Sequence, residues 1–147
     1  MHFDDLTSYT YYTRGRVIER ACNIGWLDSA IPFRTGIINP TIPQLLTIYY
    51  DALCANQMRG YYGCPLCPSN GQKPAIHMGP QSIVLGAAEL WVPCNDGRIL
   101  AAPDLIIHYM AEHQYMPPDQ FIQAVESLPV TIVGWNGEAV ARALIDP

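Results

Sequence analysis

The sequence predicts an α+β fold, a small single domain over residues 1–147 in which an antiparallel hairpin or sheet packs with three to four helices. Three observations favour this class. The 147-residue chain is 50% apolar and only 14% charged, which is enough apolar material for one core. Asn95-Asp96-Gly97 lies between two apolar runs and is typical of a β-hairpin turn. Three stretches place apolar residues at helical spacing between prolines and glycines.

The N-terminal part of the chain is expected to be extended. The tyrosines within residues 3–13 favour a strand or a packed arm, and residues 17–21 are expected to form a short strand. Trp26 follows Gly25 and is expected to fill the core rather than to stack on a ligand, because large aromatic side chains are mostly buried. Residues 31–40 are punctuated by proline and glycine and predict a loop.

The middle of the chain predicts a helix followed by a sheet. The helix is expected to begin near Thr41 and to stop within residues 56–60, with Gly60 as the left-handed residue. Residues 68–80 are rich in Pro, Gly, Ser and Asn and predict a loop. Residues 82–92 are expected to form one strand interrupted at Gly86, which pairs with a return strand over residues 98–101.

Two further helices and a C-terminal extension complete the prediction. One helix is expected to have Pro103 at its first position and to end before Tyr115, and the next spans residues 118–128. The extension over residues 129–147 is expected to hold a strand over residues 130–133 and then a short helix.

Charge and composition narrow the functional classes. The net charge is -5, and Lys73 is the only lysine. Nucleic-acid binding depends on Lys and Arg at the phosphates, so a nucleic-acid partner is not expected, whereas an acidic surface favours a basic protein partner. No apolar run approaches the ~18–20 residues of a membrane span. The acidic start, Met1 to Asp5, is not typical of a signal peptide, so a cytoplasmic location is expected.

The strongest chemical signal lies within residues 63–113, which we treat as an embedded unit. Cys64 and Cys67 form a Cys-x2-Cys pair, and His108 and His113 form a His-x4-His pair on a predicted helix. Thiolate and imidazole are the ligands that Zn²⁺ prefers in tetrahedral sites, so these four residues predict a structural zinc site. On an ideal helix the two histidines are about 140° apart, so the last helical turn is expected to loosen.

The ends of this unit resemble a classical Cys2His2 zinc finger. The similarity lies in the thiol pair, the hairpin and a Leu-x2-His-x4-His helix in which Leu105 would pack beneath the metal. The middle differs, because 40 residues separate Cys67 from His108, against about twelve in the classical finger. The helix carries no Lys or Arg, so it is not expected to read DNA.

The sequence leaves alternatives to this zinc site open. His77 and Cys94 are reserve ligands, and the four residues could also be core thiols and ordinary helix histidines without a metal. A redox role for the thiol pair is less favoured, because a Pro/Gly-rich loop follows it. Glu89 is the one carboxylate in an apolar strand and could serve as a general base or support a zinc-bound histidine. Period-2 alternation favours the simpler expectation that Glu89 points to solvent.

Longer stretches resemble a family of small uncharacterised bacterial proteins that share a domain of unknown function. The resemblance covers about residues 1–128 and implies a common α+β fold with the Cys/His set as a unit, but no activity. The stretches that carry it are Asn23-Ile24-Gly25-Trp26-Leu27-Asp28, Cys64-Pro65-Leu66-Cys67, Leu85-Gly86-Ala87-Ala88-Glu89-Leu90, Ala101-Ala102-Pro103-Asp104-Leu105-Ile106-Ile107-His108-Tyr109 and His113-Gln114-Tyr115-Met116-Pro117-Pro118.

The leading functional prediction is a zinc-stabilised cytosolic protein-interaction module. One concrete form is an antitoxin-like or immunity-like partner of a basic protein. The alternative is a metal-dependent enzyme with Glu89 as the general base, although enzymatic activity is the less favoured interpretation. A nucleic-acid-binding zinc finger ranks third, because the net charge of -5 disfavours it.

Overall fold

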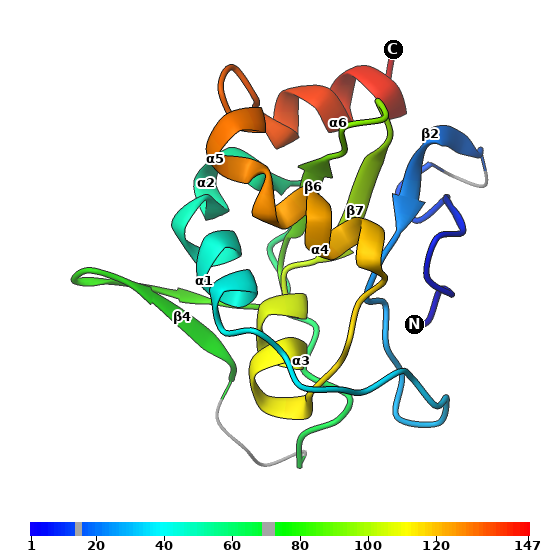
Figure 1. The fold of residues 1–147 in the computed structure, drawn as a ribbon. Coiled ribbons are helices and arrows are strands. Elements are labelled where there is room, and N and C mark those ends of the chain that lie inside the picture. The colour runs from blue at the N-terminus through cyan, green and yellow to red at the C-terminus, as the bar shows by residue number, and fades with distance from the viewer. Residues whose placement is uncertain (14–15, 69–72) are drawn as a thin grey trace.

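The fold is built around a mixed five-stranded sheet in the order β1-β2-β7-β6-β3 (Figure 1). A computed structural model describes residues 1–13, 16–68 and 73–147. β2 and β7 are parallel, and the other neighbouring strands are antiparallel. This architecture confirms the predicted α+β class. The strands are β1 (Ser8–Tyr9), β2 (Ile18–Asn23), β3 (Cys54–Ala55), β6 (Glu89–Pro93) and β7 (Ile99–Pro103).

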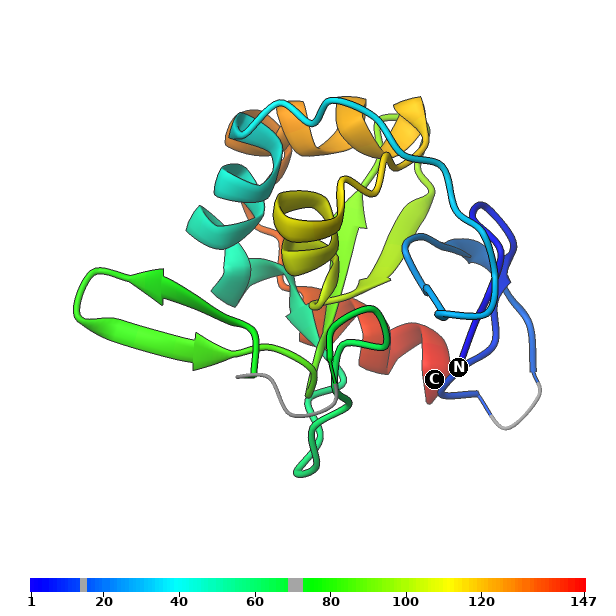
Figure 2. The same cartoon turned by 90° about the horizontal axis from the view of Figure 1, so that it is seen from below.

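Helices cover both faces of this sheet (Figure 2). The first face packs against α1 (Thr41–Ile48), α3 (Ile106–His113) and α4 (Asp119–Glu126), whereas α6 (Gly137–Ile145) lies across the second. Two short helices, α2 (Tyr50–Leu53) and α5 (Leu128–Thr131), connect these layers. Among the described residues, no helix combines the length and apolar character that a membrane crossing requires.

Side-chain alternation along β6 divides the core into two parts. Leu90 and Val92 enter the core beneath α1, α3 and α4, whereas Trp91 enters the core beneath α6. The second core also holds Trp26, which is 7% exposed and confirms the expected buried indole. Because both faces are covered, every residue of β6 is buried.

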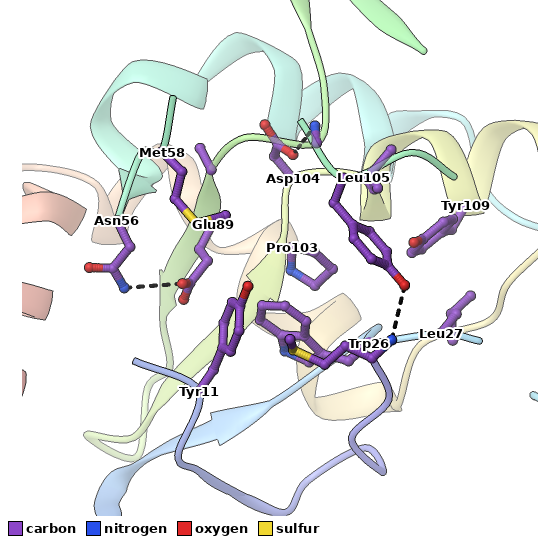
Figure 3. A pocket seen from close by; sticks show the side chains of 14 residues that line it. Tyr11, Trp26, Leu27, Asn56, Met58, Glu89, Pro103, Asp104, Leu105 and Tyr109 are labelled. Atoms are coloured by element: carbon purple, nitrogen blue, oxygen red, sulfur yellow. Dashed lines mark hydrogen bonds between the residues drawn. The ribbon is translucent and has the colours of Figure 1, made fainter. Parts of the chain in front are cut away.

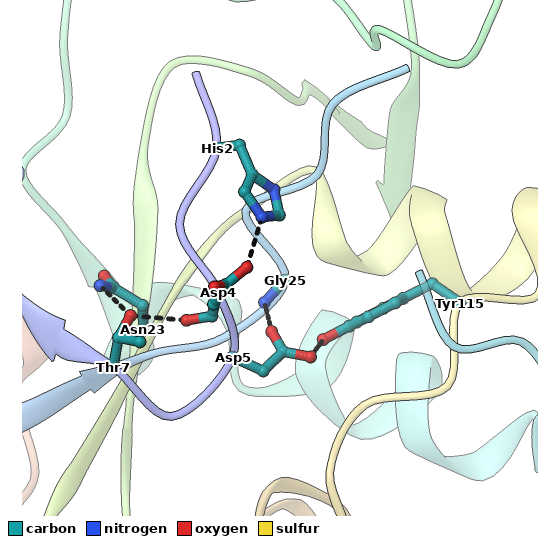
Figure 4. Close-up of polar contacts among 7 residues, drawn as sticks. All are labelled: His2, Asp4, Asp5, Thr7, Asn23, Gly25 and Tyr115. Carbon is teal, nitrogen blue, oxygen red and sulfur yellow. Dashed lines mark hydrogen bonds and ion pairs between the residues drawn. The ribbon is translucent and has the colours of Figure 1, made fainter. Parts of the chain in front are cut away.

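The N-terminal segment is fixed against the body by a partly buried network of polar contacts (Figure 4). One Asp5 oxygen accepts a hydrogen bond from the Gly25 amide at 2.8 Å, and the other accepts from the Tyr115 hydroxyl at 2.7 Å. The Asn23 amide donates to the Thr7 hydroxyl at 3.1 Å. The segment is therefore the expected packed arm, but it is extended only in part, because turns at residues 5–6 and 11–13 flank the short strand β1.

A separate hairpin, β4 (Ala75–Met78) and β5 (Gln81–Val84), projects from the body (Figure 1). The predicted single strand over residues 82–92 is therefore wrong, because β5 pairs with β4 while β6 joins the main sheet. The chain turns between them at Gly86, whose φ is +114°. The expected loop over residues 68–80 contains β4, and its residues 69–72 lie outside the described part of the chain.

Three further boundaries differ from the sequence prediction. The first helical region ends at Leu53, and Asn56 rather than Gly60 has the left-handed conformation, with φ of 53°. Pro103 closes strand β7 and pairs with Glu89, so it does not begin a helix. The expected strand over residues 130–133 is replaced by α5, which continues the helical turns after α4. The β6–β7 hairpin and the helices near residues 118–128 and 139–144 are confirmed.

Candidate metal centre

Four side chains from two distant segments meet at one point. Cys64 and Cys67 lie in the turn that precedes the β4–β5 hairpin, and His108 and His113 lie in α3. Their ligand atoms all lie within 4.8 Å of one another, and all four residues are half-buried. The structure thus brings the complete sequence-predicted set together as a group that could hold a metal ion.

Four of the six distances between these donor atoms are 3.2–3.5 Å, close to those of a tetrahedral zinc centre. The Nε2 atoms of His108 and His113 are 3.2 Å apart, and Cys67 Sγ lies 3.2 Å and 3.4 Å from them. Cys64 Sγ lies 3.5 Å from His113 Nε2. Zn–N bonds of about 2.0–2.1 Å and Zn–S bonds of about 2.3 Å place tetrahedral nitrogens about 3.3 Å apart, and sulfur about 3.6 Å from nitrogen.

Buried hydrogen bonds position the thiol turn against the histidine helix. The Tyr62 amide donates to the Gly86 carbonyl at 2.8 Å, and the Gly86 amide donates to Asp104 Oδ1 at 2.8 Å. Asp104 lies just before α3 and is 1% exposed. A Cβ atom at Gly86 would lie 2.3 Å from the Tyr62 carbonyl oxygen, so only glycine permits this approach. The same contacts therefore fix both halves of the ligand set.

α3 ends at a left-handed residue, Gln114, with φ of 53°. The amide of Gln114 donates to the Tyr109 carbonyl five residues back, and the amide of Tyr115 donates to the same oxygen at 3.1 Å. These wide bonds are made by the residues that cap the helix after His113, so the expected loosening between the two histidines stays a prediction. The ring centroids of His108 and His113 lie 4.9 Å apart.

The electrostatic environment suits metal ligands. Burial lowers the pKa of His108, and the nearby His113 lowers it further, which favours the neutral imidazole that binds metals. Burial raises the pKa of the Cys64 thiol, so a thiolate at that position needs a nearby cation. A divalent ion among the four donors would supply that charge.

The reserve ligands lie outside this group. His77 is exposed on β4 and pairs across the hairpin with Ser82, and Cys94 lies at the β6–β7 turn. Neither belongs to the set of converging ligand atoms. Leu105 is 1% exposed and belongs to the core against which Cys64 also packs, but it precedes α3 rather than lying within it.

Glu89 is buried, so the expectation that it points to solvent is wrong. It is 3% exposed and accepts hydrogen bonds from Tyr9 (2.8 and 3.0 Å), Trp91 (3.0 Å) and Asn56 (3.2 Å). Alternation does turn Glu89 away from Leu90, but α6 and the N-terminal strand cover that second face. Burial raises the pKa of Glu89 to about 7.

A second buried carboxylate, Asp104, was not recognised from sequence as a site residue. It also accepts a hydrogen bond from the Tyr50 hydroxyl at 2.7 Å, and burial raises its pKa to about 6. An aspartate directly after a proline is ordinary at the start of a helix, where its charge is favourable, so the local sequence does not mark Asp104 as a site residue. Glu89 and Asp104 line the same pocket, which none of the four candidate metal ligands lines (Figure 3).

A family model described as Domain of unknown function (DUF7919) matches residues 1–126. The chain belongs to this family. The DUF7919 region contains all four candidate ligands, Gly86, Glu89 and Asp104, and it ends with α4, so α5 and α6 lie beyond it. No curated protein and no solved structure gave a significant match.

Proposed function

We propose that this protein is a zinc-stabilised module that binds another protein in the cytosol. The observation that carries the proposal is the convergence of two thiols and two imidazoles at tetrahedral spacing. Four protein ligands fill a zinc coordination shell, which is the arrangement of structural rather than catalytic sites. Cys64, Cys67, His108 and His113 would hold the ion, which would fasten the thiol turn to α3.

The cysteines support a location of the protein in a reducing compartment. All five are free thiols, including Cys22, Cys54 and Cys94 outside the ligand group. Secreted domains of this size more often use cysteines in disulfides, because their compartment is oxidising. Free thiols beside a thiolate metal site are consistent with the cytosol.

A polar groove supports a basic protein partner. It has a volume of about 680 Å³ and lies between the β4–β5 hairpin and the α2 and α6 helices. Among the described residues its lining includes the carboxylates of Asp51 and Glu138 and no basic side chain. Lys73 lies beside it, 4.9 Å from the ring centroid of Tyr61. Among the described strands β5 pairs only with β4, so its second edge can accept main-chain hydrogen bonds from an extended partner segment. The groove therefore suits an extended, basic segment, which we take to be the partner's contact.

The charge balance favours a particular class of partner. A net charge of -5 attracts basic proteins and accelerates their association, and an inhibitor of a basic enzyme is the common biological use of such complementarity. We therefore favour an antitoxin-like or immunity-like role. An acidic chain whose histidine helix buries four of its eight residues gives little support to nucleic-acid binding.

A metal-dependent enzyme with Glu89 as the general base receives less support. The pocket that Glu89 lines includes none of the four ligands. Four protein ligands would also leave no open zinc position for a water molecule or substrate.

The proposal is tested by affinity capture from the source organism with the zinc-loaded chain. We expect a basic protein that is captured stoichiometrically and released by salt, because the contact is electrostatic. The double variant Asp51→Lys/Gln57→Lys reverses the charge of one exposed groove residue, adds a positive charge at another and should lose the partner. The control Glu19→Lys/Glu126→Lys changes exposed residues outside the groove, adds slightly more positive charge and should keep it. Absence of a stable partner, or equal loss in both variants, would count against the function.

A further inference from the structure

A small pocket lies at the edge of the main sheet where β6 begins and β7 ends, and none of the four candidate metal ligands lines it. Its walls come from the N-terminal segment, the residues after β2 and β3, the start of β6, and the end of β7 with the start of α3 (Figure 3). Glu89 forms one side, and Tyr11 and Trp26 lie close to it, with Asn56 and Met58 beside the carboxylate. Carbon atoms make up most of the exposed wall, and its charged groups are the carboxylates of Glu89 and Asp104 and the amino group of Met1.

The Glu89 carboxylate has hydrogen-bond donors but no positive partner. Across residues 1–13, 16–68 and 73–147, its neighbours are the neutral donors Tyr9, Trp91 and Asn56, and no ion pair includes it. Tyr9 lies within hydrogen-bond distance of both Glu89 oxygens but has a single hydroxyl proton, so the three donors supply three protons. Two carboxylate oxygens offer about four acceptor positions, which leaves about one free. A buried carboxylate that is ionised is ordinarily paired with a cation.

The other walls suit a cation. The rings of Tyr11 and Trp26 meet edge to face, with centroids 5.1 Å apart. The Trp26 ring is held in place because its Nε1 donates to the Ala101 carbonyl at 3.0 Å. Aromatic faces attract cations through their quadrupole, and the attraction strengthens where water is excluded. A pocket that combines one buried carboxylate with two fixed aromatic rings favours an ammonium group.

The size of the pocket limits the ligand. Its cavity volume is about 40 Å³, and one water-sized group needs on the order of 10–15 Å³. It therefore has room for a few heavy atoms, such as an ammonium head with one or two methylenes. At the mouth, the amino group of Met1 donates to the Tyr62 hydroxyl at 2.9 Å, so the rest of a ligand would pass beside Met1.

We propose that the pocket bounded by Glu89, Tyr11 and Trp26 is a binding site for a primary alkylammonium group. Glu89 pairs with the ammonium, the two rings cover its faces, and the alkyl chain leaves through the mouth. The group can come from a free aliphatic amine or from a lysine side chain of another protein. None of the four candidate zinc ligands lines the pocket, and the groove residues Asp51 and Gln57 do not line it either. Loss of the protein partner and loss of ammonium binding can therefore be observed separately.

The experiment is calorimetric titration of the zinc-loaded full chain with butylammonium chloride at pH 8. The neutral probe is 1-butanol, which has the same chain length and no charge. We expect butylammonium to bind at least tenfold more tightly than 1-butanol. Equal binding of the two probes, or no binding of butylammonium, would overturn the proposal.

Two pairs of variants identify the contacts. Glu89→Gln should weaken butylammonium binding at least tenfold, and Glu19→Gln, which removes an exposed charge elsewhere, should change it less than twofold. Tyr11→Leu should weaken binding about fivefold while Tyr11→Phe retains it, because the ring face and not the hydroxyl makes the contact. Tyr11 is only half-buried, so this pair remains informative if Glu89→Gln does not fold. Unchanged affinity in both Glu89→Gln and Tyr11→Leu would refute the site.

The pH dependence gives an independent readout in the unmodified protein. The groups that act on Glu89 are Tyr9, Trp91, Asn56 and the more distant Glu138. Since burial raises the pKa of Glu89 to about 7, its ionised fraction and the affinity for butylammonium should rise about tenfold from pH 6 to pH 8. Asp104 also lines the pocket and has its pKa raised to about 6, so Glu89→Gln should keep at most the roughly twofold rise that Asp104 can give. A flat or falling profile would contradict the pairing.

A final comparison identifies the source of the ammonium. A capped Gly-Lys-Gly peptide is titrated beside butylammonium. Binding at least tenfold tighter than butylammonium would assign the site to a protein lysine, and equal or weaker binding would assign it to a free amine. Both outcomes require butylammonium itself to bind.

Discussion

The Asp104 carboxylate accepts a hydrogen bond from the Gly86 amide at 2.8 Å, and this contact joins the start of the histidine helix to the β5–β6 turn. The Gly86 carbonyl in turn accepts from the Tyr62 amide, which lies just before the thiol turn. The other Asp104 oxygen accepts from the Tyr50 hydroxyl at 2.7 Å, so three segments meet on one buried side chain. The spacing of the four candidate ligands therefore depends on residues that do not touch the ion. Such outer contacts commonly orient ligands in metal sites.

Gly86→Ala should destabilise the fold and loosen the metal site together. The new Cβ would lie 2.3 Å from the Tyr62 carbonyl oxygen, at a residue whose φ is +114°. The control Gly97→Ala has φ of +88° but no atom within 4 Å, so it carries only the backbone cost of about 1–2 kcal/mol. We expect Gly86→Ala to lower the free energy of unfolding in urea by about 1–3 kcal/mol more than Gly97→Ala does. It should also release zinc to a chelator faster. Equal effects of the two changes would show that the Tyr62 contact is unimportant.

Loss of one ligand should lower thermal stability sharply. Cys67→Ser removes a thiolate that lies within 3.4 Å of both histidine nitrogens, and the binding free energy of a structural zinc contributes directly to folding. We expect a midpoint at least ~10 °C lower, which corresponds to roughly 3 kcal/mol or more. Cys94→Ser changes a half-buried thiol outside the group and should melt close to the unmodified protein. Identical melting of both variants would contradict the structural role.

Glu89 should make the folded protein less stable as pH rises. Its pKa is raised from 4.5 to about 7, so folding takes up a proton between these values. The resulting stability is fully present below pH 4.5 and is lost as pH rises through about 7, a decrease of about 2 kcal/mol from pH 5.5 to pH 8. Glu89→Gln keeps the shape of the side chain, since the Tyr9 hydroxyl and the Asn56 amide can reverse their hydrogen bonds. In this variant the free energy of unfolding should decrease much less as pH rises.

That comparison is made by denaturant unfolding with excess zinc, because protonation of thiolates and imidazoles favours metal release at low pH. Asp104, with its pKa raised from 3.8 to about 6, adds a smaller decrease of the same sign in both proteins. Parallel pH profiles for Glu89→Gln and the unmodified chain would argue against a titrating Glu89.

The C-terminal helix α6 should be required for the second core. Ala141 is fully buried against the cluster that includes Tyr9 and Trp91. Ala141→Glu places an unpaired charge there and should cost about 3 kcal/mol in the free energy of unfolding. Ala143→Glu makes the same change on the exposed side of α6 and should cost within ~0.5 kcal/mol. Similar stability of the two variants would mean that α6 does not cover the sheet.

The candidate ligands were predictable because each pair is close in sequence and has a spacing that is typical of metal sites. Cys-x2-Cys and His-x4-His each define a compact turn, and a predicted helix placed both histidines on one element. The turn at Gly86 could not be predicted in the same way, because its conformation is set by the approach of Tyr62, which is distant in sequence. One apolar run thus became two strands in different sheets.

The error at Glu89 has a related cause. Alternation along β6 correctly separates Glu89 from Leu90, but it cannot tell whether the second face meets water or another layer. That face is covered by α6, some 50 residues later in the chain, and by Tyr9. The pocket at Glu89 depends on the same long-range packing, so nothing in the local sequence could reveal it.

The most direct test of the zinc centre is X-ray absorption at the zinc edge, combined with elemental analysis, on protein purified without chelators. We predict about one zinc per chain, with two sulfur ligands at about 2.3 Å and two nitrogen ligands at about 2.0–2.1 Å. Protein that contains no zinc and yet melts at the same temperature after zinc is added, or a zinc shell made of oxygen ligands, would contradict the account.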